Sequence, residues 1–341
     1  MTAAAADDRH TRGMEEQEDA QFRPARSPFS MELQGVSAWY GRILAIRDLS
    51  LHVPRGSIYG LVGPSGAGKS TAIRILATVQ QPAAGSVLVD GIDAQADPTA
   101  VRGRIGYLPD VAGVYEGLTV TEYLDFYGSI HMVPARRRRQ LAGELLELIG
   151  LLDRRNDPVR QLSRGMKQLL GLARCLIHDP QILLLDEPAA GLDPRSRLDL
   201  RDILRELARF HKTVLIGSNM LSELAEVCTH LGVLRAGELV AEGSRDDIVD
   251  AAAPGARLRV RLLDPRSRDA ALDVLRTHPA CGPIEVDGES ALVAPFSGTE
   301  GDLAAILEHL GRGGAQVTEF ALDRSPLEEI VLRMTETRDQ G

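Results

Sequence analysis

The sequence predicts an α/β fold with a parallel sheet at its core, followed by a smaller α+β domain. The first observation is a pair of short apolar runs, QILLLDEP and TVLIGSN, each of which follows a helical stretch. Such runs are typical of buried parallel strands. The second is a change of character after residues 251–255, AAAPG, beyond which new strands and helices alternate.

The composition is that of an ordinary globular protein, with 341 residues, 44% hydrophobic and 26% charged. This length suffices for two domains. The net charge of −9 argues against a nucleic-acid footprint over the whole surface and leaves a local basic patch open. We expect no nucleic-acid partner. Cys175, Cys228 and Cys281 show no metal-ligand spacing and predict reduced thiols.

The N-terminal segment mixes charge, alanine and proline without periodicity, which predicts a disordered tail over 1–30. It lacks the apolar segment of a secretion signal. No apolar run in the sequence reaches 18 residues, so we expect no membrane-spanning helix in this chain.

A first domain is predicted over 31–250. MELQGVSAWYG and ILAIRDLSLHV read as strands, SIYGLVG as a strand entering a Gly-rich turn, and Asp90-Gly91 as a hairpin turn. The period becomes helical between Leu118 and Leu152. The four arginines at 136–139 favour a solvated helix face over an anionic partner, because glutamates follow on the same segment.

A second domain is predicted over 256–338. RLRVRLL alternates strictly, and a helix, two strands joined at Asp287-Gly288, a helix and a strand follow it. The order βαββαβ predicts a ferredoxin-like unit. The chain closes with SPLEEIVLRMTE, in which Ser325, Pro326 and Glu328 predict a capped helix.

The strongest motif is GPSGAGKS at 63–70, which lies between a predicted strand and the helical STAIRILATV. Its glycines let backbone N–H groups curl around a phosphate chain, Lys69 places its charge on the outer phosphates, and Ser70 can bind Mg²⁺. The residues predicted to bind the triphosphate are Gly63, Pro64, Ser65, Gly66, Ala67, Gly68, Lys69, Ser70 and Thr71.

Two adjacent carboxylates end the strand LLLDEP. Asp186 is expected to hold hydrated Mg²⁺ beside the phosphate loop, and Glu187 to polarise an attacking water. Loop and strand together predict a nucleotide enzyme that uses ATP and Mg²⁺.

A third motif narrows the class of enzyme. QLSRGMKQ carries Ser163 at a predicted helix cap, and AGLD ends at Asp193. Together they resemble the ATP-binding-cassette (ABC) family, whose signature LSGGQ differs from this chain at Arg164 and Met166. The resemblance covers 31–250 and implies an exporter-type (ABC-2-like) ATP-binding subunit. Its expected fold is a P-loop NTPase cassette: a RecA-like parallel sheet, an antiparallel β subdomain and a helical subdomain over about 111–175.

The resemblance also implies a dimer in which each ATP lies between two cassettes, most simply two copies of this chain. Residues Ser163, Arg164, Gly165 and Met166 would meet the ATP of the second cassette, and Asp193 would lie at the dimer seam. Tyr40 would stack on adenine, the alternative being a packed tyrosine on a β-surface.

At two positions the sequence departs from the family. Asp110 stands where the family has a glutamine that senses Mg²⁺ and water, so it is a catalytic and metal candidate. Asn219 stands at the switch histidine; its amide can donate a hydrogen bond to the γ-phosphate but carries no titratable proton. We predict slow hydrolysis that proceeds through Glu187.

The function implied by the resemblance is ATP-driven dimer closure coupled to a separate transmembrane permease, most simply of an exporter. The chain would then lie in the cytoplasm, on the inner face of the cell membrane. Short permease helices would enter a groove near Asp110 and the helices of 118–150. A non-transport ABC ATPase acting on nucleic acid or ribosomes, and a P-loop kinase or GTPase, are the alternatives. For the C-terminal domain, dimer contact and mere packing remain open.

Overall fold

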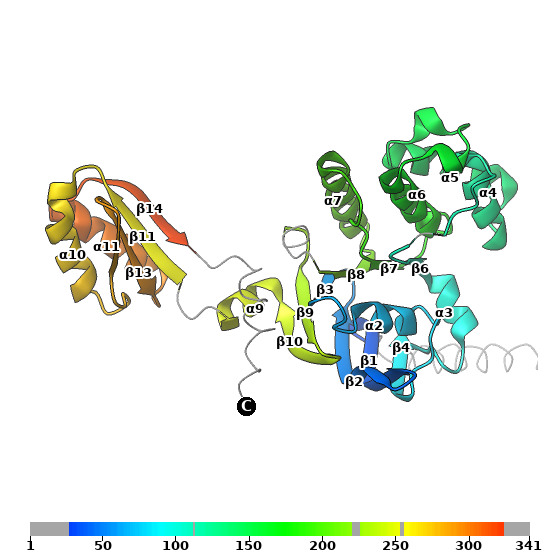
Figure 1. Ribbon diagram of the computed structural model, residues 1–341, viewed down its shortest axis with the longest axis horizontal. Helices are drawn as coiled ribbons and strands as arrows, with labels where there is room; N and C mark the ends of the chain where they lie inside the picture. The colour runs from blue at the N-terminus through cyan, green and yellow to red at the C-terminus, as the bar shows by residue number, and fades with distance from the viewer. Residues whose placement is uncertain (1–26, 112, 220–225, 253–255, 324–341) are drawn as a thin grey trace, which may run out of the picture. The chain divides into compact units, whose positions relative to one another are not determined.

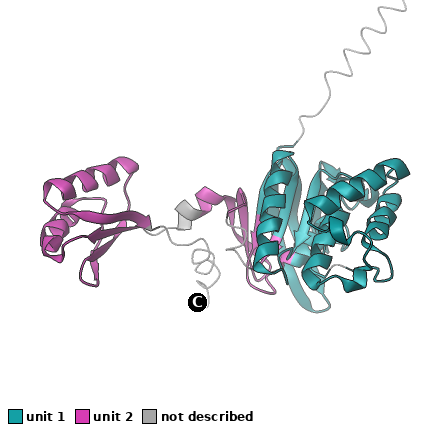
Figure 2. Cartoon of the chain, turned by 90° about the horizontal axis from the view of Figure 1, so that it is seen from above, with its two compact units in different colours: residues 1–59, 70–216 teal, residues 60–69, 217–341 magenta. Residues whose placement is uncertain are grey.

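The computed structural model describes residues 27–111, 113–219, 226–252 and 256–323 (Figure 1). The chain divides into two compact units, coloured separately in Figure 2: residues 1–59 with 70–216, and residues 60–69 with 217–341. This division falls at other positions than the boundary predicted between 250 and 256, so the predicted domains stay a prediction. No helix among the described residues is long and apolar enough to span a membrane.

An antiparallel sheet of the first unit has the strand order β2-β1-β4-β5. Its strand β1 begins at Phe29, which pairs with Pro54, so residues 27–30 belong to the folded chain and not to the predicted tail. Asp90 and Gly91 have φ of +52° and +79°, which suits the tight hairpin turn predicted there. The strands are β1 Phe29–Tyr40, β2 Ile43–Pro54, β4 Ala84–Val89 and β5 Ile92–Asp93.

A six-stranded sheet has the order β10-β9-β3-β8-β7-β6. Strands β3, β7 and β8 are buried along their whole length, which explains their mostly apolar sequences. Strands β6 and β7 run parallel, although β6 was not predicted from the sequence, and β9 and β10 form an antiparallel hairpin. The strands are β3 Ile58–Val62, β6 Ile105–Leu108, β7 Ile182–Asp186, β8 Thr213–Ser218, β9 His230–Arg235 and β10 Glu238–Ser244.

Helices follow the strands where the sequence changes to a helical period. The Gly-rich loop leads from β3 into α2, and Thr119 with Glu122 forms a capping box that starts α4. The helical subdomain consists of α4, α5, α6 and two 3₁₀ turns. The helices are α2 Lys69–Leu76, α3 Pro98–Arg104, α4 Val120–Ile130, α5 Ala135–Leu148, α6 Arg164–Leu176, α7 Pro194–Arg209 and α9 Arg245–Ala252, with 3₁₀ turns at Leu152–Arg154 and Val159–Gln161.

One of the four arginines at the start of α5 does not belong to a solvated face. The side chain of Arg138 is 19% exposed; it pairs with Asp125 of α4 at 2.7 Å and donates to the carbonyl oxygen of Val133 at 2.9 Å. Arg136, Arg137 and Arg139 are exposed as predicted. The prediction was wrong for Arg138 because periodicity locates a helix face but does not show what packs against it.

The C-terminal residues form a four-stranded sheet of order β12-β13-β11-β14. Helices α10 and α11 cover one face of it (Figure 1), and Leu275 and Ile306 pack there on Val260 and Leu292 of the sheet. The elements follow one another in the predicted order βαββαβ, while the ferredoxin-like assignment stays a prediction. The elements are β11 Ala256–Leu262, a 3₁₀ turn Pro265–Ser267, α10 Arg268–Thr277, β12 Glu285–Asp287, β13 Ala291–Phe296, α11 Glu300–Arg312 and β14 Val317–Asp323. The helix predicted from Ser325 lies outside the described residues.

Candidate functional site

The phosphate loop is shaped by its glycines and by its lysine. Gly63 has φ +156°, and a Cβ there would lie 2.2 Å from the carbonyl oxygen of Leu234, so only glycine fits. Lys69 is 5% exposed, and its Nζ donates to the carbonyl oxygens of Gly63 at 2.7 Å and Pro64 at 3.0 Å. The ammonium group is therefore held against the inner side of the loop, while Ser65 and Gly66 at its tip are exposed.

Ser70 and Asp186 meet although 116 residues separate them in the sequence. Asp186 ends strand β7 and is completely buried, and the hydroxyl of Ser70 donates to its Oδ1 at 2.9 Å. A hydroxyl and a carboxylate are oxygen donors of the kind Mg²⁺ prefers, and this ion usually keeps several waters and takes the rest of its ligands from phosphates. The hydroxyl of Ser70 and the carboxylate of Asp186 fit such a partly hydrated ion.

Glu187 has an unusual backbone. Its φ is +47°, in the left-handed region that costs a non-glycine residue about 1–2 kcal/mol. The side chain is partly exposed, in contrast to the buried Asp186 beside it. Strain of this kind concentrates at functional sites, and here it occurs at the residue predicted to polarise water.

The signature residues lie at the start of α6. Ser163 caps this helix, its Oγ accepting from the backbone N–H of Met166 at 3.2 Å, as the sequence predicted. Ser163 and Arg164 are exposed, whereas Gly165 is buried. A Cβ on Gly165 would lie 3.2 Å from Leu192, and one on Gly191 would lie 2.9 Å from Nε of Arg164. The LSRGM and AGLD segments therefore pack directly on one another, a contact that was not predicted from the sequence.

Asp193 caps the next helix, α7. It accepts from the backbone N–H groups of Arg195 and Ser196, each at 3.0 Å, and from the Ser196 hydroxyl at 2.9 Å. The hydrogen bonds from Ser196 lower the pKa of Asp193 below its usual value. The side chain of Asp193 remains exposed despite these hydrogen bonds.

Asp110 and Asn219, the two departures from the family, are both exposed. Asp110 follows β6 and lines a cavity of about 550 Å³ together with signature-helix residues. Gln168 in this cavity is 6% exposed, and its Nε2 has no hydrogen-bond partner within the described chain. Asn219 follows the C-terminal end of β8. The cavity is lined by Asp110, Val111, Val114, Arg164, Lys167 and Gln168.

Tyr40 ends strand β1 with its side chain 43% exposed. Its hydroxyl donates to Oε1 of Gln80 at 2.6 Å and accepts from Nη1 of Arg74 at 3.4 Å. Burial alone raises the pKa of Tyr40, but hydrogen bonds with Thr71 and Arg74 outweigh it and lower the pKa below its usual value. Sequence reasoning missed Arg74 and Gln80; the single charged residue within STAIRILATV, Arg74, was the available signal.

The three cysteines are free thiols, as predicted. Cys175 and Cys228 are buried, and burial raises the pKa of Cys228 to about 12. Neither is therefore a ready nucleophile or metal ligand.

Comparison with known proteins defines the class. Residues 46–190 match the family model described as ABC transporter. The daunorubicin resistance ATP-binding protein DrrA3 of Streptomyces coeruleorubidus is 37% identical over 90% of this chain and 96% of its own length. The daunorubicin/doxorubicin resistance ATP-binding protein DrrA of Streptomyces peucetius is 36% identical over 90% of this chain and 92% of its own. The Nod factor export ATP-binding protein I of Rhizobium johnstonii is 37% identical over 66% of this chain and 72% of its own.

A solved structure agrees with these relatives. It is the dimeric post-hydrolysis state of an ATP-binding cassette bound to ADP and Pi, 26% identical, with a TM-score of 0.59 over 63% of this chain and 98% of the other. The chain thus belongs to the ABC transporter family. Within that family it is an exporter-type ATP-binding subunit, an ATPase that binds and hydrolyses ATP.

Proposed function

We propose that two copies of this chain close on two ATP molecules and drive an exporter whose membrane-spanning subunit is a separate permease. The observation that carries the chemistry is the 2.9 Å bond between Ser70 and Asp186, which joins the phosphate loop's helix to the end of β7. The relatives support the direction of transport, since their names refer to drug resistance and Nod factor export.

Within one site, the loop's backbone N–H groups and Lys69 would hold the triphosphate, with Ser70 and Asp186 holding Mg²⁺. When bound, the ion neutralises charge on the outer phosphates. Glu187 would accept a proton from the water that attacks the γ-phosphorus, while the bond to the bridging oxygen breaks and ADP leaves. Asn219 would donate a hydrogen bond to the γ-phosphate, and Asp110 would orient water near the ion.

The second cassette would complete the site. Ser163 marks the exposed start of α6, and the start of a helix favours an anion. The close packing of Gly165 on Leu192 would make the signature and the Asp193 loop move as one body. A γ-phosphate that touches both copies favours the closed dimer, because a ligand shifts an equilibrium by its differential affinity for the two states.

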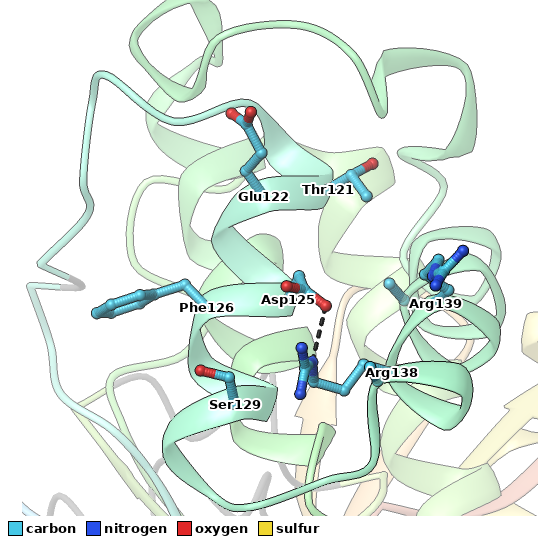
Figure 3. Close-up of a pocket in the computed structure, with 9 residues that line it drawn as sticks. Thr121, Glu122, Asp125, Phe126, Ser129, Arg138 and Arg139 are labelled. Carbon is cyan, nitrogen blue, oxygen red and sulfur yellow. Dashed lines mark hydrogen bonds and ion pairs between the residues drawn. The ribbon is translucent and has the colours of Figure 1, made fainter.

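For the permease, two cavities of the first unit offer candidate docking positions. One is the cavity beside Asp110 described above. The other, of about 540 Å³, lies between α4 and α5, where Figure 3 shows Arg138 turned toward Asp125 and Phe126 pointing away from that pair. Val111 beside Asp110 is 75% exposed and Phe126 is 39% exposed, so apolar side chains are available at both.

A mixing experiment tests the dimer. Ser163→Cys and Ser65→Cys are near-isosteric changes at exposed positions, and Cys281, the cysteine that is not fully buried, is replaced by serine in both proteins. Mixing the two single variants with MgATP should give a cross-linked dimer with a short bismaleimide. ADP, or either variant alone, should give far less. A cross-link that forms within one chain carrying both cysteines, and never between mixed chains, would exclude the sandwich.

Co-purification from membranes tests the permease. We expect Val111→Arg to abolish co-purification with the membrane protein while leaving the affinity for MgATP unchanged, because Val111 belongs to no nucleotide motif. Phe210→Arg is the matched control: Phe210 is 71% exposed at the end of α7, far along the chain from Asp110, and should keep both properties. Retention of co-purification in Val111→Arg would refute docking at this cavity.

A further inference from the structure

Besides Thr71 of the phosphate-binding segment, two residues that no motif includes hold the hydroxyl of Tyr40. Gln80 accepts its hydrogen bond at 2.6 Å, and Nη1 of Arg74, on helix α2, donates to it at 3.4 Å. Tyr40 itself is at the last position of β1, paired with Ile43 across the hairpin. Its ring is 43% exposed, so packing alone leaves much of its surface uncovered.

Arg74 also interacts with a second tyrosine. Its guanidinium lies near the side chain of Tyr107 on β6, and this tyrosine, after Tyr40, raises the pKa of Arg74. Burial raises the pKa of Tyr107, and Arg74 opposes this rise without cancelling it. The backbone of Tyr107 is held in turn, because Arg174 of helix α6 donates to its carbonyl oxygen at 3.0 Å. The arginine therefore bridges two tyrosines, of which one is anchored in the sheet.

A ring that is already oriented stacks on a base at a lower cost in conformational entropy. An exposed tyrosine at a hairpin end would otherwise sample several rotamers, and ordering it on binding would reduce affinity. Arginine suits this bridge because its planar fork presents several donors in fixed directions, whereas lysine offers a single flexible ammonium group. The bonds to Gln80 and Arg74 thus restrict the ring before any nucleotide arrives.

We propose that Arg74 is a positioning residue for base recognition, which together with Gln80 and Tyr107 holds the ring of Tyr40 ready to stack on adenine. The proposal rests on the proposed function in one respect, that Tyr40 is the stacking residue. It goes further in assigning the strength of base recognition to a bridge from α2 to β6. The triphosphate is bound by other residues, so the bridge affects the base and not the phosphates.

Calorimetric titration of the full chain with MgATP and with magnesium tripolyphosphate, which lacks the base, separates these effects. We expect Arg74→Lys, which keeps the charge but loses the fork, to weaken MgATP binding about 3- to 10-fold, the range for one or two hydrogen bonds. Tripolyphosphate affinity should change less than 2-fold. Tyr40→Phe keeps the ring and loses the hydroxyl, so it should match Arg74→Lys, and the double variant should lose no more than either single one.

Controls make each outcome decisive. Arg102 donates to the side chain and carbonyl of Thr78, just after helix α2, so Arg102→Lys perturbs a neighbouring arginine without touching Tyr40 and should bind both ligands normally. Tyr40→Ala should weaken MgATP binding about 5- to 150-fold, as expected for loss of stacking. If Tyr40→Ala binds MgATP normally, the stacking role assumed in the proposed function fails. The bridge is refuted, and the stacking role stands, if Tyr40→Ala binds MgATP weakly while Arg74→Lys binds it normally. The same conclusion follows if Arg74→Lys loses affinity for MgATP and for tripolyphosphate equally.

Discussion

Because the backbone of Glu187 is left-handed, we expect Glu187→Gly to be more stable than Glu187→Ala. At an ordinary helix or strand position the alanine variant is the more stable one. At φ +47° an alanine would keep the strain of about 1–2 kcal/mol, whereas glycine has none. Glycine loses more conformational freedom on folding, which costs about 0.5–1 kcal/mol. At the middle of both ranges, the difference leaves Glu187→Gly more stable than Glu187→Ala by about 0.5–1 kcal/mol. Both variants lose the same carboxylate contacts, so these cancel in the comparison.

The assay is thermal unfolding of the two variants, with ATPase rates measured in parallel. About 0.5–1 kcal/mol corresponds to about 1–4 °C for a folding unit of 150–250 residues. Leu198 is the control: it is 51% exposed within α7, where glycine should be less stable than alanine by about 1 kcal/mol. Both Glu187 variants should hydrolyse ATP about 10²–10⁴-fold more slowly, as loss of a general base implies.

A Glu187→Ala protein as stable as Glu187→Gly, with the control pair behaving normally, would show that Glu187 is unstrained in solution. Unchanged hydrolysis in both would remove Glu187 from the chemistry, whatever its backbone. The expected combination, greater stability with lost activity, would mean that the backbone strain is retained because it aims the carboxylate.

Three further predictions concern the ion, the switch position and pH. Ser70→Ala should raise the Mg²⁺ concentration for half-maximal ATPase activity about 10–100-fold, and an unchanged Mg²⁺ dependence would contradict its pairing with Asp186. Asn219→His should speed hydrolysis in the presence of the permease, and no gain would reject the view that asparagine slows it. The pKa of His178 is lowered to about 4, mainly by burial and next by the stacked His131, so only the unfolded chain takes up this proton between about pH 6.5 and 4. Unfolding temperature should therefore fall with acidification over this range, and less steeply in His178→Gln.

The elements could be predicted from the sequence because their signals are local. Strands β3, β7 and β8 are short, mostly apolar runs, and Asp90-Gly91 is a turn signal confined to two residues. The cap at Ser163 was predicted in the same way. A one-dimensional pattern is enough wherever a side chain interacts with its own turn of backbone.

The partners of these elements could not be predicted in this way. Arg138 lies in the same run of four arginines as the exposed ones beside it, yet α4 packs on it and supplies Asp125. The start of β1 at Phe29 depends likewise on its pairing with Pro54 in another strand. In both cases the deciding residue comes from a different element.

By itself, then, the sequence determined which chemistry the chain carries: a phosphate loop, two carboxylates at a strand end, a signature helix and an aromatic before them. Tertiary structure decided which of these groups meet. It brought Ser70 to Asp186 across 116 residues and bridged Tyr40 to Tyr107 through Arg74. The physical reason is that a hydrogen bond depends on distance in space to within a few tenths of an ångström, and only the packing of whole elements fixes distances between segments remote in the chain.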